Sequence, residues 1–369
     1  MIKNLTRQDL TDILYGCTIL GTGGGGEIQE GMDLIEEALS HGRQFRLIPV
    51  DEVPDNALIC TPYFLGAVSP VSEQEKQQYD RLPRLAENPI MAAVNRFKAY
   101  LGADFYGTIS CEMGGANSAL SFYVAAMIQG FIVDADPAGR AVPEITHSTY
   151  YLNGLPASPI VLVNAFGETA ICENIIDDKR AEQLVRSLAV ASANDIAAVD
   201  HALEMKVLRP AVIKGAVSYA LKLGQVLRLA RQTQEDSAQA IAGAGSGFVA
   251  FRGTIEDFSW KNQEGFTIGD ILIRGTGRYA GHTYKINFKN ENMISWLDNE
   301  VHATIPDLIC LMDTDTDEPV TNPNHEKGRA VAVLILPAPK AFLTEKGLKI
   351  FGPEYLGYGF KYKPAVKKI

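Results

Sequence analysis

The densest group of chemically active side chains lies in the segment DADPAGRAVPEITHS, which carries Asp134, Asp136, Glu144 and His147. Carboxylate and imidazole groups together are typical ligands of a catalytic divalent metal. Asp134 and Asp136 are two residues apart, so on a continuing strand they share a face, and a cation would relieve their repulsion. We therefore predict a divalent metal site of the zinc or manganese type with these four residues as ligands. The alternative is a solvated acidic turn in which Arg140 pairs with one carboxylate.

A second polar segment, CEMGGANS, supplies Glu112 and Asn117. Glu112 can ligate a metal or act as a general base. Asn117 can donate a hydrogen bond to a substrate carbonyl, or it can cap the helix that follows. The neighbouring Cys111 is predicted to face the other side of the sheet as a buried structural thiol.

The segment LGTGGGGE contains four consecutive glycines, Gly23, Gly24, Gly25 and Gly26. Its spacing includes G-x-G-x-x-G, but it follows a helical pattern instead of a strand, and no Lys-Ser/Thr follows, so neither a dinucleotide fingerprint nor a Walker loop is predicted. Glycines let the backbone approach a ligand closely, and the free amides of the next helix can bind a carboxylate or oxyanion. We predict an anion-binding or substrate-binding loop, with a tight packing turn between two helices as the alternative.

The remaining histidines give weaker signals. His41 lies at a predicted helix end, and His201 and His325 lie in polar contexts. All three are predicted to be structural or surface residues.

Two helices frame the glycine run. Apolar spacing predicts one helix over residues 6–20, with Thr6 and Asp9 as a capping pair, and a second over residues 28–42. A buried strand is predicted over residues 57–65, followed by a surface excursion that contains several prolines, Pro70, Pro83 and Pro89.

The order strand, loop, helix, strand over residues 105–136 predicts a βαβ unit. A crossover of this kind makes its two strands parallel, and ligands of open parallel sheets bind beyond the carboxyl ends of the strands. Glu112 and Asp134 fall at those ends, so a common site is expected there.

The second half of the chain changes character. Helices are predicted over residues 179–198 and 211–234, and from residue 247 onward short alternating segments punctuated by glycine favour an antiparallel β-rich unit. The predicted fold class is α/β plus β, with an N-terminal α/β domain over residues 1–165 containing a mainly parallel sheet, and a C-terminal domain over residues 166–369. The helices before residue 240 can belong to either half.

Composition narrows the function classes. The chain has 369 residues and a net charge of -10, which disfavours binding to nucleic acid or to anionic membranes. Five cysteines without a C-x-x-C pair argue against a disulfide framework. The N-terminus has no apolar signal core and no segment has the length of a membrane span, so a cytoplasmic protein is expected.

Five segments in their order resemble the S-methyl thiohydantoin desulfurase family. They are LGTGGGGE, CEMGGANS, DADPAGRAVPE, GFTIGDILIRGTGRYAGHTYKINFKNE and TIPDLICLMD. The resemblance runs from Leu10 to about Phe360 and implies an N-terminal α/β domain, a C-terminal β-rich domain, and replacement of sulfur by oxygen at a thiohydantoin carbon. The chain departs from the pattern at residues 315–318, where a Thr-Gly-Glu turn is expected.

The reaction implied by the resemblance gives the acidic cluster a role. Attack of water on a ring thiocarbonyl requires an activated hydroxide and stabilisation of the negative charge on sulfur, and a divalent metal supplies both. We therefore expect metal-assisted desulfuration of a thiohydantoin-type small molecule, or hydrolysis of a related hydantoin, with Glu112 as base. Arg140 and the glycine-run amides are expected to orient a carboxylate or ring carbonyl of the substrate.

Two other classes of function remain open. One is a non-catalytic or ATP-dependent partner subunit of a hydantoinase or oxoprolinase system, and the other is a simple metabolite-binding protein. In every case the expected partner is a small cyclic amide or thioamide, and the chain can form a homo-oligomer.

Overall fold

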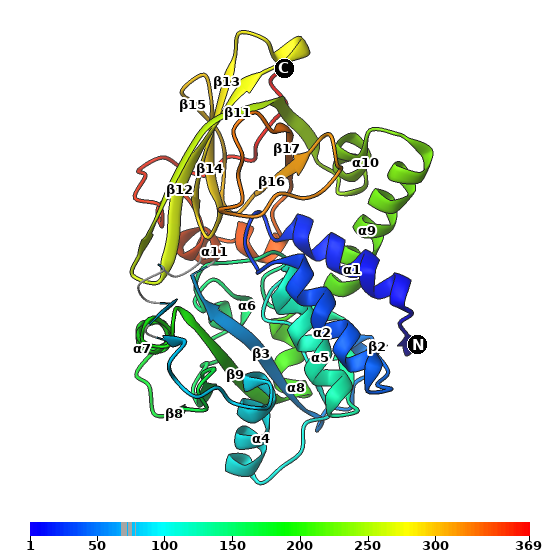
Figure 1. Ribbon diagram of the computed structural model, residues 1–369, viewed down its shortest axis with the longest axis vertical. Coiled ribbons are helices and arrows are strands. Elements are labelled where there is room, and N and C mark those ends of the chain that lie inside the picture. Colours follow the sequence, from blue (N-terminus) through cyan, green and yellow to red (C-terminus); the bar gives the residue numbers. More distant parts are fainter. Residues whose placement is uncertain (68–71, 73–75, 78) are drawn as a thin grey trace.

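The computed structural model describes residues 1–67, 72, 76–77 and 79–369. Two large β-sheets lie at opposite ends of the long axis of this part of the chain (Figure 1). The first sheet belongs to an N-terminal α/β unit, and the second forms a β-rich C-terminal unit. The predicted fold class, an α/β unit combined with a β-rich unit, is confirmed.

The first sheet has eight strands within the described ranges. In spatial order they are β1 (Lys3–Asn4), β2 (Arg46–Ile48), β5 (Phe131–Val133), β4 (Gly107–Thr108), β3 (Leu58–Gly66), β9 (Asp195–Glu204), β7 (Ile160–Val163) and β8 (Thr169–Cys172). The pairs β2/β5, β5/β4 and β4/β3 are parallel, and the remaining pairs are antiparallel. The predicted parallel strands therefore form the centre of a mixed sheet.

The parallel pairing of β4 and β5 follows from the helix that connects them, α5 (Gly115–Met127). Its sequence consists mostly of small and apolar residues, and nearly all of them are buried, because the helix packs against the sheet and against its neighbouring helices. The predicted βαβ unit is thus confirmed, and the loop that carries Glu112 lies between β4 and α5.

Helices cover the first sheet and connect the two units. Both helices that flank the glycine run are confirmed: α1 (Arg7–Leu20) begins with a capping box between Thr6 and Asp9, and α2 (Ile28–Ser40) follows the run. The further helices are α4 (Pro89–Leu101), α6 (Thr149–Leu152), α7 (Asp178–Ala191), α8 (Met205–Leu208), α9 (Ala216–Thr233), α10 (Ser237–Ala244) and α11 (Glu345–Ile350), with short 3-10 turns η1 (Val50–Glu52), η2 (Arg209–Ala211), η3 (Gly277–Tyr279) and η4 (Lys340–Leu343). None of the helices that the structure describes combines the length and apolarity needed to cross a lipid bilayer.

Two predicted segments differ from the structure. The helix predicted over residues 179–198 ends at Ala191, because Ala193 and Asn194 adopt left-handed φ angles of 62° and 60° and turn the chain into β9. The apolar residues that follow pair with both β3 and β7, so strand pairing overrides the local helical pattern. Of the predicted proline-rich excursion, Pro70 lies outside the described residues, and Pro89 begins α4.

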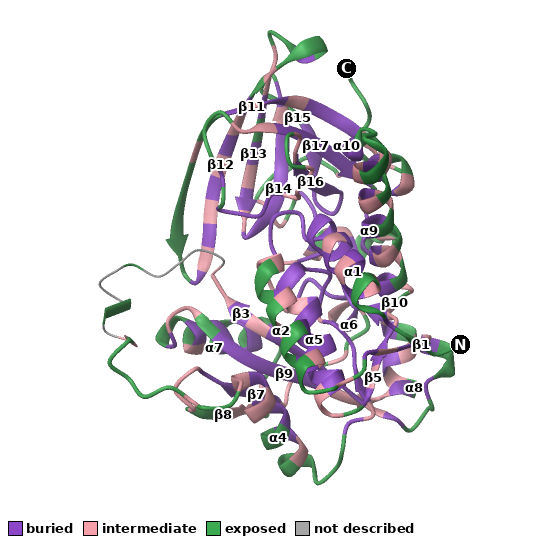
Figure 2. Ribbon diagram, turned by 45° about the vertical axis from the view of Figure 1, so that its right-hand side comes forward, coloured by how far each residue is buried: buried purple, intermediate pink, exposed green. Residues whose placement is uncertain are grey.

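The second sheet is antiparallel throughout the part of the chain that is described. Its strands in spatial order are β15 (Glu300–Thr304), β14 (Glu291–Leu297), β13 (Thr283–Lys289), β12 (Phe266–Gly275), β11 (Phe248–Gln263), β17 (Ala330–Leu336) and β16 (Leu308–Asp313). A separate two-stranded pair joins β6 (Ala135–Asp136) to β10 (Ile213–Lys214). Figure 2 shows that much of both sheets is buried.

The two units share one apolar core. The largest cluster of buried side chains contains Leu14 of α1, Leu120 of α5 and Val163 of β7 together with Met312 of β16 and Leu334 of β17. Burial of such side chains is the main favourable contribution to folding, so the two units stabilise each other.

A buried arginine reinforces this junction. Arg140 is 0% exposed, and its guanidinium donates to the Thr22 hydroxyl at 2.6 Å and to the carbonyl oxygens of Ala141 at 2.9 Å and Asp307 at 3.0 Å. Its partners come from the glycine run and from both units, and its charge lies 5.1 Å from the centre of the Phe351 ring. Burial lowers the pKa of Arg140 to about 10, so it remains charged at neutral pH.

Replacing Arg140 with Ala is expected to lower the free energy of unfolding by about 3 kcal/mol or more, because several buried oxygen atoms lose their donors. Arg140→Lys keeps the charge but not the fork of donors, so a smaller loss is expected. Denaturant unfolding midpoints measure both effects, with the exposed Arg7→Ala as the control. If the unfolding midpoint of Arg140→Ala shifted no more than that of Arg7→Ala, this role of Arg140 would be contradicted.

Candidate functional site

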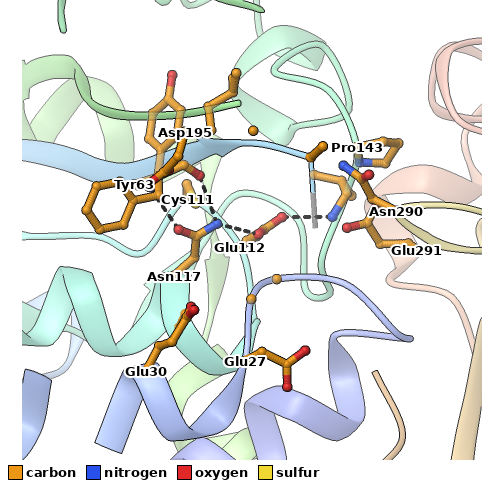
Figure 3. Close-up of a pocket in the computed structure, with 18 of the residues that line it drawn as sticks. Glu27, Glu30, Tyr63, Cys111, Glu112, Asn117, Pro143, Asp195, Asn290 and Glu291 are labelled. Atoms are coloured by element: carbon orange, nitrogen blue, oxygen red, sulfur yellow. Dashed lines mark hydrogen bonds between the residues drawn. The ribbon is translucent and has the colours of Figure 1, made fainter. Parts of the chain in front are cut away.

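A cavity of about 840 Å³ lies where the two units meet. Its walls come from the glycine run, α2, β3, the loop between β4 and α5, the segment after β6, β9, and the second unit at Asn290–Glu291 and residues 321–324 (Figure 3). A cavity of this size suits a small-molecule ligand. Of the predicted site residues, those that line it are Gly23, Gly25, Gly26, Glu112, Asn117 and Glu144.

Glu112 and Asn117 form a fixed pair in this cavity. One carboxylate oxygen of Glu112 accepts from the Asn117 amide at 2.8 Å and the other from the backbone N–H of Val142 at 2.8 Å. Asn117 in turn accepts from the Phe64 N–H at 2.9 Å and donates to the Phe64 carbonyl. Figure 3 shows Asn117 beside Glu112. The helix cap of α5 is Gly114, so Asn117 orients Glu112 instead of capping the helix.

Burial raises the pKa of Glu112 above its usual value. The two hydrogen bonds from Asn117 and Val142 and the charges of Arg140 and Arg186 act in the opposite direction and favour the ionised form. Glu112 therefore combines a raised proton affinity with a fixed position, which is what a general base requires.

The glycine run is held between the two units. A Cβ atom on Gly25 would lie 2.4 Å from the Cα of Gly114, and one on Gly24 would lie 1.9 Å from Oε1 of Glu291. The Gly25 carbonyl accepts from the backbone N–H groups of Ala116 and Asn117 at the start of α5. The run is therefore a close-packed turn, as the alternative proposed, and it also forms part of the cavity wall.

Glu291 is a site residue that the sequence did not reveal. It begins β14, is 2% exposed, and its Oε2 atom has no hydrogen-bond partner. Burial, together with the negative charge of Glu112, raises the pKa of Glu291 well above its usual value. The proton affinity of Glu291 is therefore higher than that of an ordinary glutamate, and the residue lines the same cavity as Glu112.

The predicted aspartates have other partners. Asp134 accepts from the Ser218 N–H at 2.9 Å and the Ser218 hydroxyl at 2.5 Å, in the first turn of α9 and away from the cavity. Asp136 is buried, and one of its oxygens accepts from the backbone N–H groups of Gly139 at 2.6 Å and Ala138 at 3.2 Å. Burial raises the pKa of Asp136 to about 8, and its second oxygen has no partner.

Glu144 and His147 form a third, separate arrangement. Glu144 accepts from Lys289 at 2.6 Å and from the Tyr355 hydroxyl at 2.6 Å. Burial opposes its ionisation, but His147 and Lys289 outweigh this and lower the pKa of Glu144 to about 2. His147 packs against Phe351 and Tyr355, and burial lowers its pKa to about 4.

These positions bear on the predicted metal site. The carboxylates of Asp134 and Glu144 are occupied by different protein donors, and Asp136 accepts from backbone N–H groups of its own turn. Among residues 1–67, 72, 76–77 and 79–369, no group of three or more His, Cys, Asp or Glu side chains is arranged to hold a metal ion. The four predicted residues are therefore not arranged around a common cation.

Arg140 was predicted to orient the substrate, but it does not line the cavity. Its donors are used by Thr22 and by backbone carbonyls, and it is fully buried. It acts on the site through its charge, which favours the ionised forms of Glu112 and Glu291.

Another part of the cavity wall contains residues that were predicted to be structural. Asp200 accepts from the Tyr63 hydroxyl at 2.9 Å and lies 2.7 Å from Nδ1 of His201. Burial favours neutral His201, but Asp200 outweighs it and raises the pKa of the imidazole. Cys111 also lines the cavity, and burial raises its pKa well above the usual value, so it is a neutral thiol. The only sequence signal was an Asp-His pair inside an otherwise apolar strand.

The fold and the cavity define a two-unit α/β and β protein with a cavity of ligand size at the junction of the units. The chain belongs to the S-Me-THD-like family: residues 8–174 match the model of its N-terminal domain and residues 176–365 that of its C-terminal domain. The fold is also that of a crystal structure of a protein from Chromobacterium violaceum, with 22% identity, a TM-score of 0.77, and coverage of 98% of this chain and 99% of the other. A comparison with curated proteins gave no match.

Gly24→Ala tests the contact between the glycine run and Glu291. The backbone of Gly24 tolerates alanine, but the added Cβ meets the Glu291 carboxyl, so overpacking is expected to cost about 1–3 kcal/mol of stability. Adding Glu291→Ala should recover part of this loss, which a double-mutant cycle by denaturant unfolding measures. Gly243→Ala on α10, where nothing lies within 4 Å, is the matched control. Strictly additive effects of the two substitutions would contradict the contact.

Asp136 makes the stability of the protein depend on pH. Its pKa is about 8 in the folded chain against an ordinary value of 3.8, so the unfolded chain releases this proton at lower pH than the folded chain. The contribution to stability is complete below about pH 4 and is lost as the pH rises towards 8. Asp136→Asn should flatten this loss between pH 5 and about 8 in unfolding experiments. The exposed Asp104→Asn should keep the slope of the unmodified protein; the same slope in Asp136→Asn would show that Asp136 is already ionised.

Proposed function

We propose that the chain is an enzyme that replaces the sulfur of a thiohydantoin-type ring by oxygen through hydrolysis, in the cavity between its two units. Membership of the S-Me-THD-like family supports the ring chemistry. The observation that carries the proposal is a pair of buried carboxyl groups, Glu112 and Glu291, which the two units contribute to one cavity. The same pair would serve hydrolysis of a related hydantoin.

The surroundings of the two carboxyl groups assign them different roles. Glu112 accepts two hydrogen bonds from N–H groups, which stabilise its carboxylate. Glu291 has one oxygen without any partner, and the negative charge of Glu112 opposes its ionisation. Two carboxyl groups with different proton affinities are the arrangement that general acid–base catalysis uses. Glu112 is therefore the base and Glu291 the acid.

The reaction then proceeds in two balanced steps. In the first, Glu112 takes a proton from water as its oxygen bonds to the ring carbon, and Glu291 gives its proton to the sulfur, which accepts the electron pair of the C=S bond. In the second, the new hydroxyl returns a proton to Glu291, Glu112 protonates the sulfur, and the C–S bond breaks. The products are the ring carbonyl and hydrogen sulfide, and both carboxyl groups return to their starting states. Where the sulfur is methylated, the ring carbon has a C=N bond instead of C=S, so Glu291 protonates the ring nitrogen in the first step, and Glu112 protonates the departing sulfur of methanethiol in the second.

Substitution of the pair should separate the two roles. Glu112→Gln and Glu291→Gln are each expected to lower kcat by about 10²–10⁴-fold without loss of folding. In the unmodified protein, turnover should rise with pH as Glu112 ionises and fall as Glu291 ionises, with the lower limb above the usual glutamate pKa. In the pH profile of the residual turnover, Glu112→Gln should lack the rise at low pH, and Glu291→Gln should lack the fall at high pH.

The assay measures sulfide or methanethiol released from thiohydantoin and S-methyl thiohydantoin, together with the mass of the ring product. Glu36→Gln is the control, because Glu36 lies on α2 outside the cavity and pairs with Arg7. Full turnover in either substituted glutamate would remove that residue from the mechanism, and no turnover by the unmodified chain would favour a partner-subunit function.

A further inference from the structure

The charged groups of the cavity are mostly acidic. The described residues that line it include nine Asp and Glu side chains, against Arg186 and His201 as the basic groups. A concave site lined by one sign of charge concentrates ligands of the opposite sign. The cavity is therefore unsuited to an anionic ligand group.

Both basic groups are already paired. Arg186 forms an ion pair with Glu182 at 2.7 Å, donates to the carbonyl oxygens of Pro143 and Gly265, and lies over the Phe266 ring. His201 is paired with Asp200. A carboxylate on the ligand would find no unpaired cation among these lining groups, in contrast to the expectation from the glycine run.

The acidic groups form a rim at the mouth of the cavity. Glu27, Glu30, Asp33 and Glu37 lie at or near one face of α2, and Asp195 approaches from the start of β9. Figure 3 shows Glu27, Glu30 and Asp195 among the side chains of the pocket.

Two of the rim carboxylates accept no hydrogen bond from another side chain among the described residues, although each has a backbone partner. Glu27 accepts from Thr321 and Asn324, Asp33 from Gln29 and Glu37 from Tyr123, whereas no side-chain partner is found for Glu30 or Asp195 among the described residues. Both residues are exposed at the surface. The charges of Glu27 and Asp33 contribute to a raised pKa of Glu30, and the charge of Glu30 contributes to a raised pKa of Asp195. A cation between Glu30 and Asp195 would relieve this repulsion.

An independent feature of the inner wall also indicates a ligand. Glu291 lines the cavity and is only 2% exposed, and its Oε2 atom has no hydrogen-bond partner among the described residues. A buried polar atom of this kind normally has a partner in the functional complex. A ligand whose ring carries a hydrogen-bond acceptor would give Glu291 a partner. A positive group on the same ligand would offset the negative charge of the rim carboxylates.

We infer that the substrate of this cavity is a thiohydantoin-type ring with a cationic substituent, such as an ammonium or guanidinium group, held at the rim by Glu30 and Asp195. This inference rests on the proposed function for the identity of the ring. The charge of the substituent follows from the acidic rim and from the paired state of Arg186 and His201.

The test compares the thiohydantoins of lysine, norleucine and glutamate, which share the ring and differ in the charge of the side chain. For the unmodified protein, kcat/KM for the lysine compound should exceed that for the glutamate compound at least about tenfold, with norleucine between them and with a smaller preference in high salt. In the double variant Glu30→Gln, Asp195→Asn, the ratio of lysine to norleucine should fall towards one. Glu36→Gln, a substitution on the same helix outside the cavity, should leave the ratio unchanged.

Binding of the same compounds by calorimetry separates the two proposals. Equal turnover of all three compounds, preference for the glutamate compound, or an unchanged ratio in the double variant would overturn the cationic substrate and leave the desulfuration intact. Tight, rim-dependent binding of the lysine compound without sulfur release would support the cationic ligand and overturn the proposed reaction.

Discussion

The guanidinium of Arg140 is the interaction on which the geometry of the cavity depends. It joins Thr22 of the glycine run to the carbonyl oxygens of Ala141 and Asp307, and thereby links the first unit to the second. A charge this deeply buried is costly unless its donors are satisfied, so the surrounding backbone must stay in place. The cavity walls are therefore preorganised by a group that does not touch the ligand.

The same charge acts on the two carboxyl groups. Arg140 favours the ionised forms of both Glu112 and Glu291, but only Glu112 also has two N–H donors. The two N–H donors favour the carboxylate form of Glu112, whereas burial and the negative charge of Glu112 oppose ionisation of Glu291. The absence of a side chain at Gly24 contributes as well, because it leaves the space that the Glu291 carboxyl occupies. The carboxylates on α2 add further negative charge at the mouth of the cavity.

Local patterns predicted what depends on local structure. The capping box at Thr6, the helices on both sides of the glycine run, the βαβ unit, and the β-rich second half all follow from periodicity and turn residues. The sequence predicted Glu112 as a site residue because it follows β4, one of the central parallel strands. Its partner Asn117 was found for the same reason.

What the sequence could not supply was the long-range partner of each polar group. Asp134 caps a helix some eighty residues later in the chain, at Ser218, and Glu144 pairs with Lys289 of the second sheet. Their closeness in sequence therefore did not produce a common metal site. Glu291 lies next to Asn290, whose φ of 57° is typical of a turn, so the local sequence indicates only a turn at this position. The packing of the two units is what places Glu291 in the wall of the cavity that Glu112 also lines.

If Glu291 is the acid and Glu112 the base, Glu291 holds a proton at neutral pH while Glu112 is ionised, and these protonation states can be observed directly. Infrared spectroscopy distinguishes a protonated carboxyl from a carboxylate, and a difference spectrum between the unmodified protein and Glu291→Gln isolates the contribution of Glu291. We expect a protonated carboxyl signal at neutral pH that disappears in Glu291→Gln and remains in Glu112→Gln. Loss of a carboxylate signal in Glu291→Gln instead would show that Glu291 is ionised and would contradict its role as the acid.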